Sequence, residues 1–417
     1  MKKIILPLLG LLPLLTFAGG FQVNLQGNQQ TGMGHLGTSF YLGASSAYFN
    51  PAMLGHGESK ISVEAGANGI TSYVIYQNQE TGATAETDNP MGTPFHLYGS
   101  YRINDQITAG LAVYTPFGSS VVWGDDWDGK YLIQDISLSA IFIQPTFSIK
   151  ASDKISVGLG LVYATGAFEL NRAIAFQSSQ SAYGQTNLKG NASGFGYNFG
   201  FHYKPTEKLN VGVTYRSGIK MALNGGDATF TAPKSTATNL PPTNKFDAEL
   251  PLPGTTTIGL SYDVSEKLTV AIEYSRVAWD VYQSLDFDFE TNTSALKDSK
   301  NARKYEASSI FRVGAQYKVN EKIIARAGAY YDQSPVQDEY FNPETPNTDN
   351  IGLTCGISYE ISEKLSVDGS FLYIDGQERE SYYTDPNNKS ASAGGQNFGG
   401  KYKARSFIPG IGLRYNF

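Results

Sequence analysis

Histidine and cysteine, which often carry enzymatic or metal chemistry, are few in this 417-residue sequence and are not spaced for it. The four histidines, His35, His56, His96 and His202, show no metal-ligand spacing. The single cysteine, Cys355, excludes an intramolecular disulfide framework and a cysteine-based metal site. No Gly-x-Ser-x-Gly elbow presents a serine nucleophile. We therefore expect no catalysis, no metal and no cofactor, and turn to the elements that the chain builds.

The N-terminus predicts export from the cytoplasm. Residues 1–18 have the pattern of a signal peptide, with Lys2 and Lys3, an apolar run and Ala18 at the expected cleavage point. No later stretch supplies the ~18 consecutive apolar residues of a membrane-spanning helix, so a helical membrane protein is excluded. The net charge is −6 and no basic cluster indicates a nucleic-acid partner.

A charge-free segment follows the predicted signal peptide. No Asp, Glu, Lys or Arg occurs between Lys3 and Glu58, and glycines interrupt any helical or strand period from Gly20 to Gly55. A flexible linker would have a similar glycine content. Aromatic and large apolar residues recur along the segment, however, whereas disordered chains carry few of them. We predict that residues 19–57 form a hatch, an irregular plug that fills an enclosed space.

Alternation of apolar and polar residues dominates the remaining chain, residues 58–417. From Ile351 to Tyr359 the apolar residues stand at every second position, and the same pattern recurs from Leu268 to Tyr274. The alternating runs are long enough for the ~9–11 residues that a strand needs to cross a bilayer. Cys355 falls on the apolar side of its run, where we expect it to face lipid.

Six short polar turns of one pattern set the expected number of strands. Each is followed by an alternating run, as in a β-hairpin, and long Gly-, Pro- and Asn-rich stretches separate them. Six turns join twelve strands, and one strand at each end makes fourteen. The sequence therefore predicts an all-β fold, a 14-stranded antiparallel transmembrane β-barrel plugged by the hatch, with both termini periplasmic. The turns are 102–107, 150–155, 204–209, 263–268, 318–323 and 360–365.

The last strand ends at Phe417 after alternating from Phe407 onwards. A terminal phenylalanine on an alternating strand resembles the C-terminal signal of bacterial outer-membrane barrels, which the barrel-assembly machinery would recognise. We expect the protein in the outer membrane of a Gram-negative bacterium, in contact with outer-membrane lipid.

Several local motifs resemble the FadL-type outer-membrane transporter family (FadL/TodX). Gly20-Phe21-Gln22 followed by Asn50, Pro51 and Ala52 resembles the family's hatch signature, with Met53 where the family usually has Gly. Further along the chain, in the same order as in the family, stand Thr115–Gly118, Trp123–Tyr131 and Tyr331–Val336. The similarity runs from Gly20 to Phe417 and leaves no additional domain.

The resemblance implies passive transport of long-chain fatty acids or other hydrophobic molecules. A ligand would bind in an outer-loop groove, for which Phe117, Trp123 and Trp127 are candidates, and pass to an internal apolar site. Arg172, or Lys130, would contact a carboxylate head group. A solvated loop arginine and interface anchoring of the tryptophans remain the alternatives.

The resemblance also implies a lateral exit where the third strand bends beside the Asn50–Ala52 end of the hatch. That strand is expected from Gln106 to Thr115, with Gly110 inside it and Pro116 and Gly118 after it. Glycine permits a bend, and proline cannot donate to the hydrogen-bond ladder. An ordinary barrel glycine followed by a loop proline would give the same sequence.

Other functions remain open. A related channel could take aromatic hydrocarbons, which need no head-group cation. A plain porin would require the hatch to be displaced. A lipase would need an outer Ser/His pair, and none of the four histidines lies in the outer half of a predicted strand beside a suitable serine.

Overall fold

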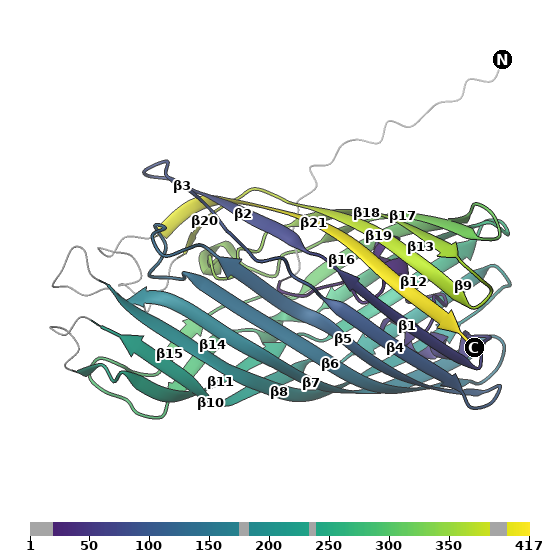
Figure 1. The fold of residues 1–417 in the computed structure, drawn as a ribbon, viewed down its shortest axis with the longest axis horizontal. Coiled ribbons are helices and arrows are strands. Elements are labelled where there is room, and N and C mark those ends of the chain that lie inside the picture. The colour runs from purple at the N-terminus through teal and green to yellow at the C-terminus, as the bar shows by residue number, and fades with distance from the viewer. Residues whose placement is uncertain (1–19, 175–182, 233–238, 384–397) are drawn as a thin grey trace, which may run out of the picture.

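The computed structural model describes residues 20–174, 183–232, 239–383 and 398–417, so the predicted signal peptide lies outside the described residues. Strands dominate and form one closed antiparallel barrel, with the purple N-terminal segment inside it (Figure 1). None of the described helices is long and apolar enough to cross a membrane. The helices are α1 (Asn28–Thr31), α2 (Ser46–Phe49), η1 (Pro51–His56), η3 (Trp279–Val281) and η4 (Asp338–Tyr340).

The described residues contain twenty-one strands, which build the predicted fourteen wall strands because seven wall strands are interrupted and counted as two pieces. The uninterrupted ones are β5 (Ile107–Val122), β6 (Asp135–Lys150), β7 (Ile155–Ile174), β8 (Gly184–Tyr203), β17 (Ile323–Asp332), β18 (Asn350–Glu360) and β21 (Phe398–Asn416). The interrupted ones are β1/β2 (Ile61–Asn68, Thr71–Asn78), β3/β4 (Thr84–Glu86, Phe95–Arg102), β9/β10 (Leu209–Arg216, Ile219–Thr231), β11/β12 (Thr243–Leu252, Thr255–Asp263), β13/β14 (Leu268–Val277, Ser284–Phe289), β15/β16 (Ser299–Ala302, Ser308–Lys318) and β19/β20 (Leu365–Gly376, Arg379–Tyr383).

Closure occurs between the first and last wall strands. β1 pairs with β4 on one side and with β21 on the other, in the register Ser62↔Asn416. The backbone amide of Phe417 donates to the carbonyl of Ile61 at 2.9 Å. A closed sheet leaves no unpaired strand edge in the bilayer, which is the condition that a membrane barrel must meet.

The six predicted turns are confirmed, and they share one hydrogen-bonding device. In each, an Asn, Ser or Thr side chain accepts the backbone N–H groups two and three residues later, which closes a tight polar turn. The remaining three turns repeat it. The accepting residues are Asn104, Ser152, Thr206, Ser265, Asn320 and Ser362.

The strands alternate between an apolar outer face and an inner face that meets the hatch. Leu353 and Ile357 are half exposed on the outer face, and Cys355 stands exposed between them, as the alternation predicts. The C-terminus lies at the short-turn end (Figure 1). Gly20, the first described residue, instead lies in the interior, where the side-chain amide of Asn347 donates to its carbonyl at 2.8 Å.

The third wall strand differs from expectation. β5 does not end at Thr115 but continues to Val122. Its pairing with β6 is regular at Gly110 and shifts register between Tyr114 and Phe117. Pro116 lies at that shift, because it has no N–H for the ladder.

The closed wall predicts resistance to detergent. Most wall strands pair with a neighbour on each side, with β5 beyond Tyr114 as an exception, so unfolding must break many backbone hydrogen bonds at once. The unboiled protein should therefore migrate differently from the boiled protein on a detergent gel, with a β-type circular dichroism spectrum before boiling. Equal migration and a mainly helical spectrum would contradict the fold.

Candidate functional site

The hatch packs directly against wall positions that lack side chains. A Cβ on Gly32 of the hatch would stand 2.7 Å from the Cα of Gly356 on β18, so both positions require glycine. Close approach of this kind lets a segment without charges fill the lumen. Met33, Leu36, Ala44 and Ala47 of the hatch are completely buried.

Wall carboxylates hold the hatch through its backbone. Glu273 of β13 accepts the backbone N–H groups of Gly37 at 2.8 Å and Thr38 at 2.6 Å. Glu64 of β1 accepts the N–H of Ser45 at 3.1 Å. Both carboxylates are buried, and hydrogen bonds to a charged acceptor are among the stronger ones.

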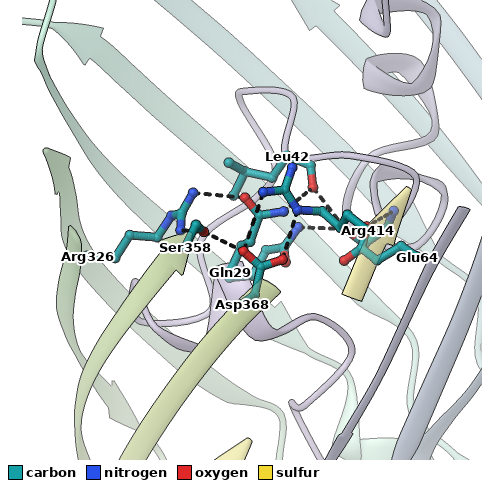
Figure 2. Close-up of polar contacts among 9 residues, drawn as sticks. Gln29, Leu42, Glu64, Arg326, Ser358, Asp368 and Arg414 are labelled. Carbon is teal, nitrogen blue, oxygen red and sulfur yellow. Dashed lines mark hydrogen bonds and ion pairs between the residues drawn. The ribbon is translucent and has the colours of Figure 1, made fainter. Parts of the chain in front are cut away.

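A buried network beside Glu64 joins the wall to the hatch (Figure 2). Arg414 of β21 binds Asp368 of β19 at 2.8 Å, and Ser358 of β18 links Asp368 to Arg326 of β17. The guanidinium of Arg326 donates to the side chain of Gln29 in the hatch at 2.8 Å. Four wall strands are therefore tied to α1 through one chain of polar contacts.

The predicted hatch signature fixes the opposite end of the segment. Asn50 caps η1 by accepting the N–H of Ala52 at 3.0 Å, and its amide group donates to Thr38 at 2.6 Å and to Phe201 of β8 at 3.1 Å. A Cβ on Gly158 of β7 would lie 2.3 Å from the carbonyl carbon of Pro51. Asn50 and Pro51 thus dock η1 onto the wall.

The beginning of the hatch takes the place of a wall strand beside β5. β4 follows β5 only as far as the pair His96↔Tyr114. Beyond it, Gln22 bridges Phe117, with Val23 donating to Pro116 at 2.8 Å and Gly118 donating to the carbonyl of Phe21 at 3.3 Å. The wall therefore has a gap along the outer part of β5, and the hatch pairs with the exposed edge.

A cavity of about 480 Å³ lies at this gap. We call it the gap cavity. Its walls are Gly20–Val23 of the hatch, residues 89–94, Thr115–Val121 of β5 and Ser137–Ala140 of β6, with smaller contributions from β2, β21 and residues 345–347. None of the described residues that line it is charged.

A narrower cavity of about 40 Å³, the apolar cavity, lies beside it among β6, β7, β8, β10, β11 and β14. Met221, Leu250 and Phe287 are among its lining residues, and apart from Ser139 its lining is apolar or glycine. The two cavities share Phe117 and residues 138–140 as lining. Phe117, which borders both cavities, packs against Phe21 at 6.1 Å between ring centroids and against Phe142 at 5.9 Å.

The two predicted groove tryptophans lie within the outer loops. Trp123 and Trp127 are buried and stack on each other with 4.5 Å between their centroids. Each indole N–H donates to a backbone carbonyl, to Pro343 at 2.9 Å and to Ile133 at 2.6 Å. This stacking buries both tryptophans among the outer loops, and their part in a ligand groove stays a prediction.

The two predicted head-group cations lie at the outer end of the barrel. Lys130 binds Asp126 at 3.3 Å and lies 4.7 Å from the ring centre of Tyr183. Arg172 is half-buried on β7, where it pairs with Thr186 of β8. It stands two residues after the buried Leu170, so both lie on the inner face of the strand. Neither residue lines the apolar cavity or the gap cavity. Gly110 faces the hatch, since a Cβ there would lie 2.6 Å from Leu54.

Several interior polar residues were not predicted from the sequence. Arg216 of β9 donates to the Tyr114 hydroxyl at 2.7 Å and the Tyr48 carbonyl at 2.9 Å, and Arg312 of β16 donates to Ser275 at 2.6 Å. The only sequence signal for these interior residues is their position on the inward-facing side of alternating strands. Among the described residues, no group of three or more His, Cys, Asp or Glu side chains could hold a metal ion.

Known proteins resemble most of the chain. Residues 11–417 match the family model described as outer membrane protein transport protein (OMPP1/FadL/TodX). The long-chain fatty acid transport protein of Escherichia coli K12 is 25% identical over 407 residues, covering 87% of this chain and 89% of that protein. Outer membrane protein P1 of Haemophilus influenzae is 26% identical over 325 residues, covering 71% and 69%.

Two solved structures share the fold. A FadL homologue from Pseudomonas aeruginosa superposes with a TM-score of 0.86 at 18% identity, covering 96% of this chain and 100% of that chain. The toluene transporter TodX of P. putida has a TM-score of 0.74 at 18% identity, covering 93% and 97%.

Docking of the hatch should weaken as the pH falls from 7 towards 4. The pKa of His56 is lowered from 6.5 to about 4, first by burial and then by the nearby His202, Lys150 and Lys204. In an undocked hatch, His56 would have its ordinary pKa, so the undocked state would bind more protons than the docked state between the two pKa values. The free energy of docking that His56 contributes above pH 6.5 is therefore lost on acidification. Single-channel conductance should rise over this range.

The His56→Gln variant provides the comparison, because the glutamine side chain cannot titrate. The variant should show a flatter dependence of conductance on pH than the unchanged protein. Identical profiles for the two proteins would contradict a contribution from His56.

Proposed function

This chain belongs to the outer membrane protein transport protein family (OMPP1/FadL/TodX), whose members carry hydrophobic compounds across the outer membrane, and we propose from that premise a route for its ligand. The ligand enters among the outer loops, occupies the apolar cavity, passes Phe117 into the gap cavity, and leaves sideways beside β5. Long-chain fatty acids or similar hydrophobic molecules are the proposed cargo, and no catalytic step is involved.

The observation that carries this proposal is the shared lining of the two cavities. Phe117 and residues 138–140 border both, so displacement of one aromatic ring would join them. An aliphatic chain gains roughly 0.8 kcal/mol for each methylene transferred from water to such a lining. Binding and release down a gradient then require no energy source.

Lateral release fits the chemistry of the gap. Straight passage towards the short-turn end is filled by α1, α2 and η1. Arg326 holds α1 through Gln29, Glu64 binds the backbone of Ser45 before α2, and Asn50 holds η1 on β8. At β5, by contrast, the hatch is held by backbone hydrogen bonds of Val23 and Gly118 and by the packing of Phe21. A hydrophobic ligand can replace the packing of Phe21, and it gains little by entering periplasmic water.

The head group of the ligand distinguishes two candidate cargoes. For a fatty acid, Arg172 on the inner side of β7 is the proposed partner of the carboxylate, with Lys130 second because it already binds Asp126. The relative from E. coli is named for fatty acids. An aromatic hydrocarbon is the second candidate, favoured by the absence of charged residues among the described lining of both cavities.

Two further contacts belong to the proposal. The exposed outer face of the strands would contact outer-membrane lipid. β21, which precedes the terminal Phe417, would be the strand recognised by the barrel-assembly machinery.

A disulfide across the gap tests the exit. Gln22 and Phe117 face each other as a pair that exchanges no backbone hydrogen bond, the cross-strand position where Cα atoms lie closest, ~4.5 Å apart. Gln22→Cys with Phe117→Cys, made in a Cys355→Ala background, should transport little ligand when oxidised and regain transport when reduced. The reduced protein is its own control. Equal transport in both states would move the exit elsewhere.

Replacement of Arg172 distinguishes the two cargoes. If the ligand is a fatty acid, Arg172→Ala should weaken its binding by about 10- to 100-fold (~1.5–3 kcal/mol) and leave the matching alcohol unchanged, because only the acid loses a charge-assisted contact. Equilibrium binding to the protein in nanodiscs would measure both. Equal effects on acid and alcohol would remove Arg172 as the head-group partner.

A further inference from the structure

Two small cavities that contain polar groups meet at His35 of the hatch. One, of about 150 Å³, borders the gap cavity through Gln22 and Ile70, and the other, of about 60 Å³, reaches Arg312. His35 and Gln22 line both. We call these two cavities together the His35 pocket.

Six side chains that line the His35 pocket have buried polar atoms without a hydrogen-bonding partner among the described residues. These atoms are both ring nitrogens of His35, Nε of Arg312, Oδ1 of Asp332, Oε1 of Gln22, Oδ1 of Asn198 and Oγ1 of Thr255. His35, Arg312 and Asp332 are each more than nine-tenths buried. A buried polar group without a partner is costly, so such a cluster indicates a bound molecule that supplies the missing hydrogen bonds.

The charges of the pocket balance. Its charged lining residues within the described chain are Arg216 and Arg312 against Glu273 and Asp332. Arg216 is already engaged by Tyr114, Tyr48 and Gln144, and Glu273 by two hatch amides. Burial, followed by the field of Arg312, lowers the pKa of His35 to about 3, so its ring is neutral and offers one donor and one acceptor.

We propose that the His35 pocket binds an uncharged hydroxyl group at the end of a hydrophobic ligand whose body lies in the gap cavity. A hydroxyl both donates and accepts, which matches the mixture of Asp332 and Gln22 acceptors with the Arg312 donor. A carboxylate would add a third negative group to a site that has no surplus positive charge. The inference rests on the proposed function, and it adds that amphiphiles with a neutral polar end are preferred.

Water is the competing occupant, because the larger cavity has room for several molecules and offers polar partners. The two occupants differ in one consequence. A ligand hydroxyl makes affinity depend on the polar end of the ligand, whereas resident water does not.

Binding of three probes of equal chain length tests the proposal: 1-dodecanol, its methyl ether, which lacks the donor, and dodecanoate. Binding would be measured on the full chain in lipid nanodiscs, corrected for partition into empty nanodiscs. Dodecanol should bind about tenfold more tightly than the ether and more tightly than dodecanoate. The ratio of alcohol to ether affinity should fall to about twofold in Arg312→Met and in His35→Asn, where asparagine tolerates the positive φ of 64° at this position.

The matched control is Arg276→Met, which removes an exposed arginine from the neighbouring strand β13 and should leave the ratio unchanged. Migration of unboiled samples on a detergent gel verifies that each variant is folded, and His35→Asn leaves the wall intact. Equal binding of alcohol and ether to the unchanged protein, or tighter binding of dodecanoate, would overturn the proposal while leaving transport intact. Failure of all three probes to bind would instead reject the proposed function.

Discussion

The structure depends on a division of charge between the hatch and the wall. The hatch has no charged residue, so its polar contacts come from backbone groups and amide or hydroxyl side chains, while the wall supplies the buried ions. Glu273 and Glu64 accept hatch N–H groups, and Arg326 donates to Gln29. Glu273, Glu64 and Arg326 are thereby hydrogen-bonded, which is the condition for keeping their charges inside a lumen filled by protein.

Charged side chains also distinguish two regions of the interior. On one side, the apolar cavity and the gap cavity are lined without charges in the described chain, and on the other, the His35 pocket collects guanidinium, carboxylate and imidazole groups. Gln22 borders both the gap cavity and the His35 pocket. One hatch residue therefore lies where an apolar ligand body and a polar ligand end would meet.

The weakest part of the wall coincides with the start of the hatch. β4 stops following β5 beyond Tyr114, Pro116 cannot donate to a ladder, and the register with β6 shifts there. An unpaired strand edge in a membrane is costly, and Gln22 and its neighbours cover it by strand pairing. The stability of the wall and the position of the hatch are therefore coupled at β5, whereas η1 is fixed independently by Asn50.

Local pattern was enough to predict the wall. Period-two alternation and six Asn-, Ser- or Thr-containing turns determine strand number, direction and closure, because each signal acts within a few residues and needs no knowledge of distant partners. The charge-free stretch likewise indicated a segment suited to an enclosed space. The predicted roles of Arg172, Lys130 and Gly110 came from resemblance, and alternation alone gave only the side of the wall that each residue faces.

Tertiary structure decided the contacts between segments that are distant in sequence. Gln22 meets Phe117, Gln29 meets Arg326, and His35 shares a pocket with Arg312 and Asp332. Trp123 and Trp127 stack inside the outer loops because their indole N–H groups find backbone acceptors there. An irregular hatch has no period from which such pairings follow, so the cavities and their polar partners are set only when the barrel closes around it.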